Sequence, residues 1–374
     1  DHRDLHSFPT RRSSDLVMLK ALCIGQDIKD ILLKDPKTKD QMLAYEESTA
    51  TYYVAPAYLD LQVNGYAQVT LDEGYSEDAL LYMSDAMRRD GTSMFVPTVI
   101  TCTRDYMAQV LKITSDFMAK FPGRIPGVHL EGPFISQGRA GIHQASLIRV
   151  MAEEDLELLL KYRKAISYIT CSPESVPPLM RKALIDAGIK LSLGHSTADF
   201  KAADEFLKAG ATLGTHLYNA MTKASNGRTP GCVEALLLNK TFTGVICDGV
   251  HVAWPLVQLA HQILGRNFVL VTDALAAAGV KDPTTFPKFN FAGTKIFNDP
   301  VRGCIDSNGT LGGSRLVMAQ GVRNLVNELG LSLEDAVYAG AISPYGALRL
   351  CPLPYINVLD DKLNVVAPSI LAPV

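Results

Sequence analysis

The chain of 374 residues lacks several features that would place it in whole classes of protein. It has no excess of positive charge, because 36 Lys and Arg stand against 39 Asp and Glu, so no nucleic-acid partner is expected. No apolar run approaches the roughly 18 residues of a membrane span, and no apolar segment of a secretory signal stands near the start. These absences predict a soluble protein with no membrane partner.

Cysteine is scarce and follows no pattern. The seven cysteines are odd in number, widely scattered and never spaced CxxC. This argues against a disulfide framework and against a zinc site built from cysteines. It fits a reducing compartment, and we expect a cytoplasmic location.

The two ends of the chain differ from its middle. Residues 1–16, DHRDLHSFPTRRSSDL, are polar and aperiodic, and we interpret them as a non-native leader; without its two histidines, six remain. Residues 17–54 and 351–374 are each too short to fold alone, so together they are predicted to form a small β domain. Residues 55–350 are predicted to form the main domain.

In the main domain, short β-rich apolar runs alternate with stretches of helical period. This alternation is typical of βα units around a parallel sheet, and a count of eight runs predicts an α/β fold of the (β/α)8 TIM-like barrel type. The runs are 56–62, 93–100, 125–131, 166–171, 189–195, 211–216, 243–248 and 268–273.

The connecting segments include clear helical stripes and one exception. Helices are predicted over 76–87, 107–118 and 174–187, the last ended by Gly188. Residues 286–313 instead hold short alternating segments with an Asn-Gly turn, which predicts a β-hairpin inserted before the last helices.

Polar residues gather where the predicted strands end, which is where barrels of this type place their active sites. Run three ends at Glu131, run five at His195, run six at His216 and run eight at Asp273. One carboxylate and two imidazoles from three strand ends match the open three-ligand set of a catalytic zinc ion, and the aspartate is left to handle a proton. The pattern predicts metal-assisted hydrolysis. By contrast, His261 lies in a segment with helical periodicity and is not expected to be a metal ligand.

Several stretches of the chain form a series typical of a known family. They are PAYLDLQVNG (56–65), HLEGPF (129–134), LGHS (193–196), THLYNAM (215–221), GRTPG (227–231), DGVHV (248–252) and VTDA (271–274). In the order and spacing of these stretches, the chain from about 53 to 350 resembles N-acetylglucosamine-6-phosphate deacetylase of the amidohydrolase superfamily. The resemblance implies that Glu131, His195 and His216 bind the metal and that Asp273 is the proton shuttle.

The first predicted strand departs from the commoner amidohydrolase pattern. Many amidohydrolases carry HxH there as ligands of a second metal, whereas this chain has Gln62 and Asn64. Amide side chains are poor ligands for a divalent transition ion. One divalent metal per chain is therefore expected, with Zn²⁺ as the first choice and Fe²⁺ as the alternative.

The resemblance also implies a binding site for a sugar phosphate. A phosphate dianion calls for a guanidinium group and free backbone N–H groups. The family match gives these roles to Arg228 and to the Asn219-Ala220 segment, and gives His143 and His251 contacts with sugar hydroxyls or the acetyl carbonyl. If the GRTPG motif is disregarded, Arg228 is best interpreted as a solvated loop residue. Since family members are often dimers, a homodimer is expected.

The activity implied is metal-dependent removal of the N-acetyl group of N-acetylglucosamine 6-phosphate, giving glucosamine 6-phosphate and acetate. Two enzyme alternatives stay open, namely an N-acetylgalactosamine-6-phosphate deacetylase and another N-acyl amidohydrolase. A third alternative, from a different class, is a catalytically silent binding protein. Intact Glu131, His195, His216 and Asp273 favour an enzyme.

Overall fold

The computed structural model describes residues 52–371, so the predicted leader and residues 17–51 of the predicted small domain lie outside the described residues. The chain divides into two compact units. One is formed by Tyr58–Leu353 and the other contains strands from both ends of the chain. Over the described range, no helix combines the length and the apolar character needed to cross a membrane.

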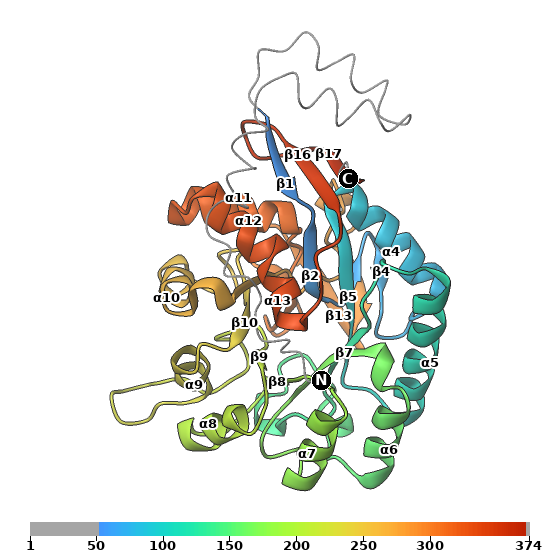
Figure 1. Cartoon of the computed structure of the whole chain (residues 1–374), viewed down its shortest axis with the longest axis vertical. Helices are drawn as coiled ribbons and strands as arrows, with labels where there is room; N and C mark the ends of the chain where they lie inside the picture. The colour runs from blue at the N-terminus through green and yellow to red at the C-terminus, as the bar shows by residue number, and fades with distance from the viewer. Residues whose placement is uncertain (1–51, 372–374) are drawn as a thin grey trace, which may run out of the picture. The chain divides into compact units, whose positions relative to one another are not determined.

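The larger unit is built on an eight-stranded sheet in the order β11-β10-β9-β8-β7-β6-β5-β2, with every neighbouring pair parallel (Figure 1). The sheet curls into a nearly closed barrel, which confirms the predicted fold class. Its strands are β2 (Tyr58–Val63), β5 (Thr92–Ile100), β6 (Val128–Glu131), β7 (Ile166–Cys171), β8 (Leu191–Leu193), β9 (Leu213–Gly214), β10 (Phe242–Ile246) and β11 (Phe268–Val271).

The barrel strands are apolar on both faces because both faces are covered. All nine residues of β5 and all six of β2 are buried, without the alternation of a half-exposed strand. One face of each strand packs in the barrel interior and the other against the helices. The interior cluster includes Leu59, Leu61, Met94, Val96, Tyr168, Leu213, Ile246, Val269, Val271 and Leu316.

Backbone and side-chain contacts join the first and last strands of the barrel. A single parallel bridge joins Val63 to Ala274, just beyond the end of β11. Deeper in the barrel, the Asp60 carboxylate accepts hydrogen bonds from the backbone N–H of Thr272 at 3.2 Å and from its hydroxyl. Burial raises the pKa of Asp60 to about 7. The two strand ends thus meet at the edge where the polar residues gather.

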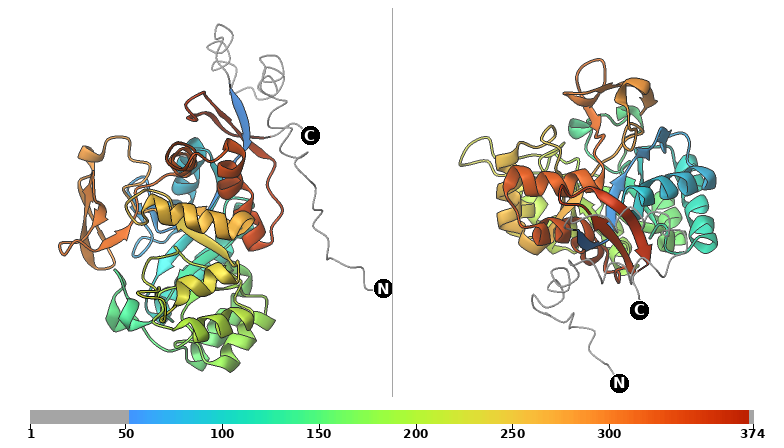
Figure 2. Two further views of the ribbon diagram at one scale, coloured as in Figure 1. Left: turned by 90° about the vertical axis from the view of Figure 1, so that its left-hand side faces the viewer. Right: turned by 90° about the horizontal axis from the view of Figure 1, so that it is seen from above.

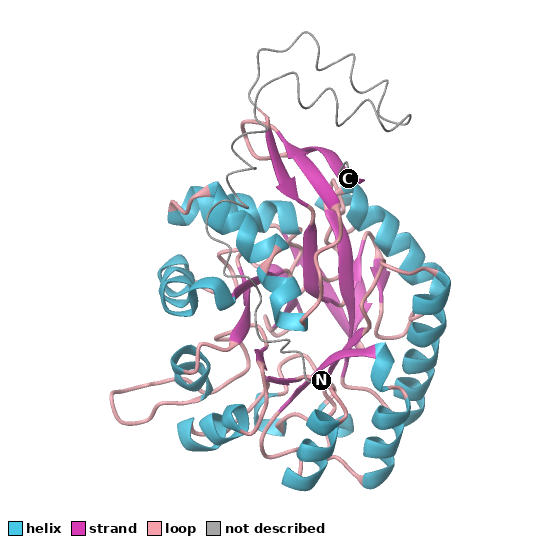
Figure 3. Cartoon of the chain, viewed as in Figure 1, coloured by secondary structure: helices cyan, strands magenta, loops and turns pink. Residues whose placement is uncertain are grey.

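Helices surround the barrel strands (Figure 3). Several of these helices begin with an N-cap residue. The side chains of Ser76, Thr103 and Ser332 accept hydrogen bonds from backbone N–H groups in the first turns of α4, α5 and α12. The helices are α4 (Glu77–Arg89), α5 (Arg104–Lys120), α6 (Glu153–Lys161), α7 (Pro178–Asp186), α8 (Phe200–Lys208), α9 (Cys232–Leu238), α10 (Trp254–Leu264), α11 (Met318–Leu329), α12 (Leu333–Ala341) and α13 (Ser343–Leu348).

Helix α7 begins later than its apolar stripe predicted. The stripe started at residue 174, whereas the helix starts at Pro178, with Pro177 in the N-cap position. A residue that precedes proline is disfavoured in the helical region, so two consecutive prolines keep the segment before them extended.

A four-stranded antiparallel sheet occupies the region where one hairpin was expected. It consists of β12 (Lys288–Phe291), β13 (Thr294–Asp299), β14 (Gly303–Ile305) and β15 (Leu311–Gly313), paired in that order (Figure 2, orange). The Asn-Gly turn joins the last two strands, where Gly309 has a φ of +81°. Two further short strands, β3 (Gly65–Tyr66) and β4 (Val69–Thr70), pair next to the first barrel strand.

The smaller unit joins strands from the two ends of the chain. Its described part is a three-stranded antiparallel sheet in the order β1-β16-β17, formed by β1 (Tyr53–Pro56), β16 (Tyr355–Leu359) and β17 (Val365–Leu371). Val54 is in register with Val358, and these two side chains form a small core with Ala367.

Candidate active site

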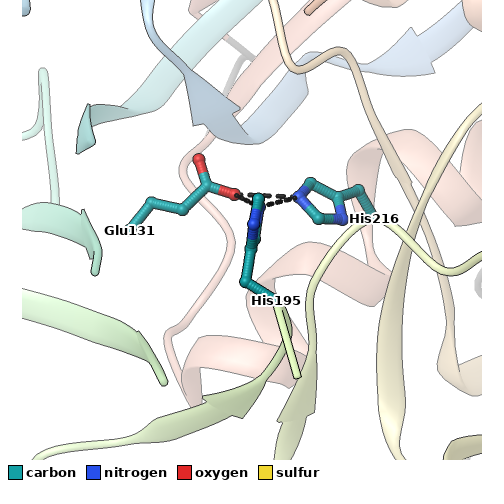
Figure 4. A group of neighbouring side chains, drawn as sticks. All are labelled: Glu131, His195 and His216. Atoms are coloured by element: carbon teal, nitrogen blue, oxygen red, sulfur yellow. Dashed lines mark hydrogen bonds and ion pairs between the residues drawn. The ribbon is translucent and has the colours of Figure 1, made fainter. Parts of the chain in front are cut away.

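Three buried side chains meet at the carboxyl end of the barrel. Glu131 is the last residue of β6, whereas His195 and His216 come just after β8 and β9. The Glu131 Oε1 atom lies 2.9 Å from His216 Nε2 and 3.3 Å from His195 Nε2, and the two Nε2 atoms are 3.0 Å apart. Figure 4 shows the three side chains pointing toward one another. This group could hold a metal ion, since one ligand atom from each residue lies within 4.8 Å of the others.

The orientation of His195 is set by a backbone carbonyl. Its Nδ1 atom lies 2.8 Å from the carbonyl oxygen of Arg139. A carbonyl only accepts, so Nδ1 carries the proton and, in the neutral ring, the Nε2 lone pair faces the cluster. The backbone at His195 and His216 is left-handed, with φ of +45° and +28°. Such conformations in residues other than glycine cluster at functional sites, because the surrounding fold must impose them.

The cluster behaves electrostatically as an anion next to two imidazoles. Burial alone would raise the pKa of Glu131, but hydrogen bonds and positive charge from His195 and His216 hold that pKa well below its usual range. For His216, burial would lower the pKa, and the opposing interaction with Glu131 raises it. A buried carboxylate that depends on nearby positive charge is well suited to a bound cation.

Asp273 lies beside this cluster, in the left-handed region just after β11, with a φ of +50°. Its Oδ1 atom accepts hydrogen bonds from the Gln62 side chain at 3.0 Å and from the Asn64 side chain at 2.6 Å. The same Gln62 nitrogen donates to Glu131 Oε1 at 3.1 Å. Burial, followed by the negative charge of Glu131, raises the pKa of Asp273 to about 6. A carboxyl with a pKa in this range can both accept and donate a proton near neutral pH.

Two further histidines are held near the cluster. The Nδ1 atom of His143 accepts from the backbone N–H of Thr101 at 3.3 Å and lies 2.8 Å from its hydroxyl. Because a backbone N–H only donates, the proton of the neutral His143 ring is on Nε2. Burial, and then the charge of His195, lower the pKa of His143 to about 3, so the ring is neutral at physiological pH. The centres of the His143 and His195 rings are 4.5 Å apart.

His251 is oriented by a carboxylate. Its Nδ1 atom lies 2.7 Å from Asp248 Oδ2, and its backbone N–H donates to Asp248 Oδ1 at 2.9 Å. Burial would raise the pKa of Asp248, but the hydrogen bonds and charge of His251 lower it overall. The charge of His251 also acts on Asp273, whose pKa it lowers.

The predicted phosphate-binding residues have different surroundings. The Asn219 side chain donates to the carbonyl oxygens of His216 and Leu217, at 3.1 and 3.2 Å, which places Asn219 and Ala220 next to the cluster. Arg228 lies instead in an exposed loop before α9 that projects from the barrel (Figure 1). Within residues 52–371, no hydrogen bond or ion pair engages its guanidinium group.

Sequence reasoning missed several contributors to the site. The Arg139 carbonyl could not be found, because a backbone acceptor has no residue-type signal. Gln62 and Asn64 were noticed only as absent metal ligands, although they donate to the acids of the site. The first strand has a register irregularity between Asp60 and Val63, so a regular alternation of faces could not have placed these amides from the sequence alone.

The chain is similar to several known deacetylases. No family model matches the chain. The chain is 31% identical over 315 residues to N-acetylglucosamine-6-phosphate deacetylase of Haemophilus influenzae, covering 84% of this chain and 80% of that protein. It is 35% identical over 290 residues to N-acetylgalactosamine-6-phosphate deacetylase of Shewanella sp., covering 77% and 72%. The crystal structure of N-acetylglucosamine-6-phosphate deacetylase from Pasteurella multocida superimposes with a TM-score of 0.81 at 30% identity, covering 85% of each chain.

Proposed function

The chain belongs to the N-acetylglucosamine-6-phosphate deacetylase family of the amidohydrolase superfamily, and from this premise we propose that it removes the N-acetyl group of N-acetylglucosamine 6-phosphate, releasing glucosamine 6-phosphate and acetate. The observation that carries the proposal is the joint placement of the Glu131, His195 and His216 group and of Asp273 at one end of the barrel. A hydrolase of an unactivated amide needs both a metal site and an adjacent group that transfers protons.

We further propose that Glu131, His195 and His216 hold one divalent metal ion, with Zn²⁺ preferred over Fe²⁺. The donor set supports this, because a carboxylate and two imidazoles from three strand ends leave a position open for substrate or water. The hydrogen bond from His195 Nδ1 to the Arg139 carbonyl supports it too, since it leaves Nε2 free to bind a cation. Such a cation would supply a water nucleophile at neutral pH and polarise the amide carbonyl.

Asp273 is the proposed proton shuttle. It accepts a proton from the attacking water and donates it to the amine nitrogen as the C–N bond breaks. We propose that His251, held by Asp248, contacts the acetyl carbonyl oxygen. We also propose that His143, with its ring proton on Nε2, donates to a sugar hydroxyl.

The proposed phosphate contacts are Arg228 and the Asn219-Ala220 segment. The exposure of the Arg228 loop supports a role for a second subunit, because a loop that projects from one barrel can reach a neighbouring one. We propose a homodimer on this basis, and light scattering on the purified protein tests it. A cytoplasmic location is also proposed, and the six described cysteines, all free thiols and five of them buried, suit a reducing compartment.

One experiment tests the proposed function directly. Acetate release is measured with N-acetylglucosamine 6-phosphate, its galacto epimer, unphosphorylated N-acetylglucosamine and an N-acetyl amino acid. Metal content is determined on the same sample. We expect the gluco phosphate to be the best substrate, with about one zinc ion per chain. Preference for the galacto epimer or for the N-acetyl amino acid would replace the proposed substrate, two tightly bound ions would refute the single-metal site, and no turnover with bound metal would refute the enzyme.

A further inference from the structure

The Gln62 side chain bridges the two acids of the site. Its Nε2 atom lies 3.1 Å from Glu131 Oε1 and 3.0 Å from Asp273 Oδ1, so both of its amide hydrogens are directed at carboxylates. Asn64 adds a second donor to the same Asp273 oxygen, at 2.6 Å. All four side chains are buried. The two amides thus place partial positive charge between the acids.

The two oxygens of Asp273 therefore differ. Oδ1 accepts two N–H groups, whereas no hydrogen bond from a protein donor reaches Oδ2 in the part of the chain that the structure describes. A proton added to Oδ1 would have to displace one of these donors, because each N–H needs a lone pair that the new O–H bond would occupy. A proton added to Oδ2 displaces nothing.

We propose that Gln62 and Asn64 are positioning residues that hold Asp273 by Oδ1, so that Oδ2 is the oxygen that receives and returns the proton. This inference rests on the proposed deacetylase function. As the water oxygen bonds to the acetyl carbon, one water O–H bond breaks and its proton bonds to Oδ2. As the C–N bond breaks, the same proton passes from Oδ2 to the amine nitrogen, and the carboxylate is restored.

The amide side chains are not needed to close the barrel. The backbone N–H of Asn64 already donates to the Ala274 carbonyl at 2.8 Å, next to the Val63–Ala274 bridge. In addition, the Asn64 Oδ1 atom is buried without a hydrogen-bond partner among the described residues. An unpaired buried acceptor lowers stability, so the amide at this position is better explained by its donor than by packing.

The test replaces Asn64 with leucine, which has a similar shape and no donor. We expect kcat to fall at least tenfold, with KM changed less than twofold and with one metal ion per chain retained. The solvent deuterium isotope effect on kcat should rise, because a poorly oriented shuttle makes proton transfer limit the rate. Asn298→Leu is the matched control, since Asn298 is also a buried amide with an unpaired Oδ1, in β13 of the inserted sheet. Its kcat should equal that of the wild type.

Two results with Asn64→Leu would overturn the inference. Wild-type kcat with a wild-type isotope effect would show that the amide does not position the shuttle, and joint loss of metal and activity would show that it supports the metal site instead. If wild-type protein released no acetate from any substrate, the proposed function would fail. Crystal structures of wild type and Asn64→Leu would then still decide the positioning, because an Asp273 carboxylate in the same orientation in both would overturn it.

Discussion

Replacing Asp273 with asparagine should slow turnover and, at the same time, stabilise the metal-free protein. The loss in kcat should be about 10²-fold to 10⁴-fold, the usual contribution of a positioned acid-base group, because an amide cannot carry the proton. The bound metal should remain, since Asp273 is not among the proposed ligands. Gln62 and Asn64 can still donate to the amide oxygen, so the side chain should keep its place.

The gain in stability follows from the raised pKa of Asp273. The pKa goes from 3.8 in an unfolded chain to about 6 in the folded protein, where burial and Glu131 disfavour the charge. The folded state therefore binds the proton more tightly than the unfolded state, and stability falls as pH rises from about 4 to about 6. Above that range the ionised side chain costs about 3 kcal/mol, and at pH 5 about half as much. A bound cation would offset part of this cost.

The assay combines turnover with thermal unfolding of the metal-free protein at pH 8 and pH 5. Asp273→Asn should unfold at a higher temperature than wild type at pH 8, with a smaller difference at pH 5. Asp116→Asn, at an exposed position of α5, removes the same charge without burial; it should leave kcat unchanged, and the loss of its exposed ion pair with Lys112 should cost at most about 0.5 kcal/mol of stability. Near-normal kcat in Asp273→Asn, or a variant no more stable than wild type at pH 8, would refute the reasoning.

Three further predictions concern the ligands, the phosphate and the fold. His195→Ala should lose metal and activity together, as measured by metal analysis and acetate release, and retention of a full metal equivalent would exclude it as a ligand. Arg228→Ala should raise KM for the phosphorylated sugar by an amount worth roughly 2 to 4 kcal/mol and leave the unphosphorylated sugar unaffected; equal losses on both substrates would contradict a phosphate contact. Asp155 forms ion pairs with Arg104 at 2.9 Å and with Arg149 at 3.0 Å. Burial alone would raise the pKa of Asp155, but these two arginines lower it to about 2. A carboxyl whose pKa is lower in the folded state stabilises the fold when the pH is above its unfolded pKa. Asp155→Asn should therefore lower the free energy of unfolding by about 1 to 2 kcal/mol at pH 7, a figure discounted for the exposure of Arg104. That difference should disappear as pH falls from about 4 to about 2, and a melting temperature difference independent of pH would count against it.

The barrel and the three clustered residues were predictable because each leaves a local signal. Buried parallel strands appear as uninterrupted apolar runs, and a polar residue that ends such a run must lie at the barrel mouth. Glu131, His195 and His216 are separated in sequence, yet their places at three strand ends were enough to predict that they meet. Strand starts were less accurate, since the third run was expected from residue 125 and β6 starts at Val128.

Other features depend on contacts that no local pattern contains. The role of Gln62 arises only because the first and last strands meet, which lets one amide reach two acids. The hydrogen bond between His195 and the Arg139 carbonyl depends on the path of a loop, which residue types do not reveal. The inserted sheet was underestimated because only its Asn-Gly turn gives a strong hairpin signal, whereas β12 and β13 meet through Ala292 and Gly293, both with positive φ.

The meeting of the first and last barrel strands at the catalytic end has a consequence for the order of assembly during synthesis. The contact between Gln62 and Asp273 spans 211 positions of the chain, so it cannot form until the eighth strand has left the ribosome. Glu131, His195 and His216 all emerge before that strand. A nascent chain that already carries the three proposed metal ligands would still lack the proposed proton shuttle, so the proposed activity would require the eighth strand and closure of the barrel.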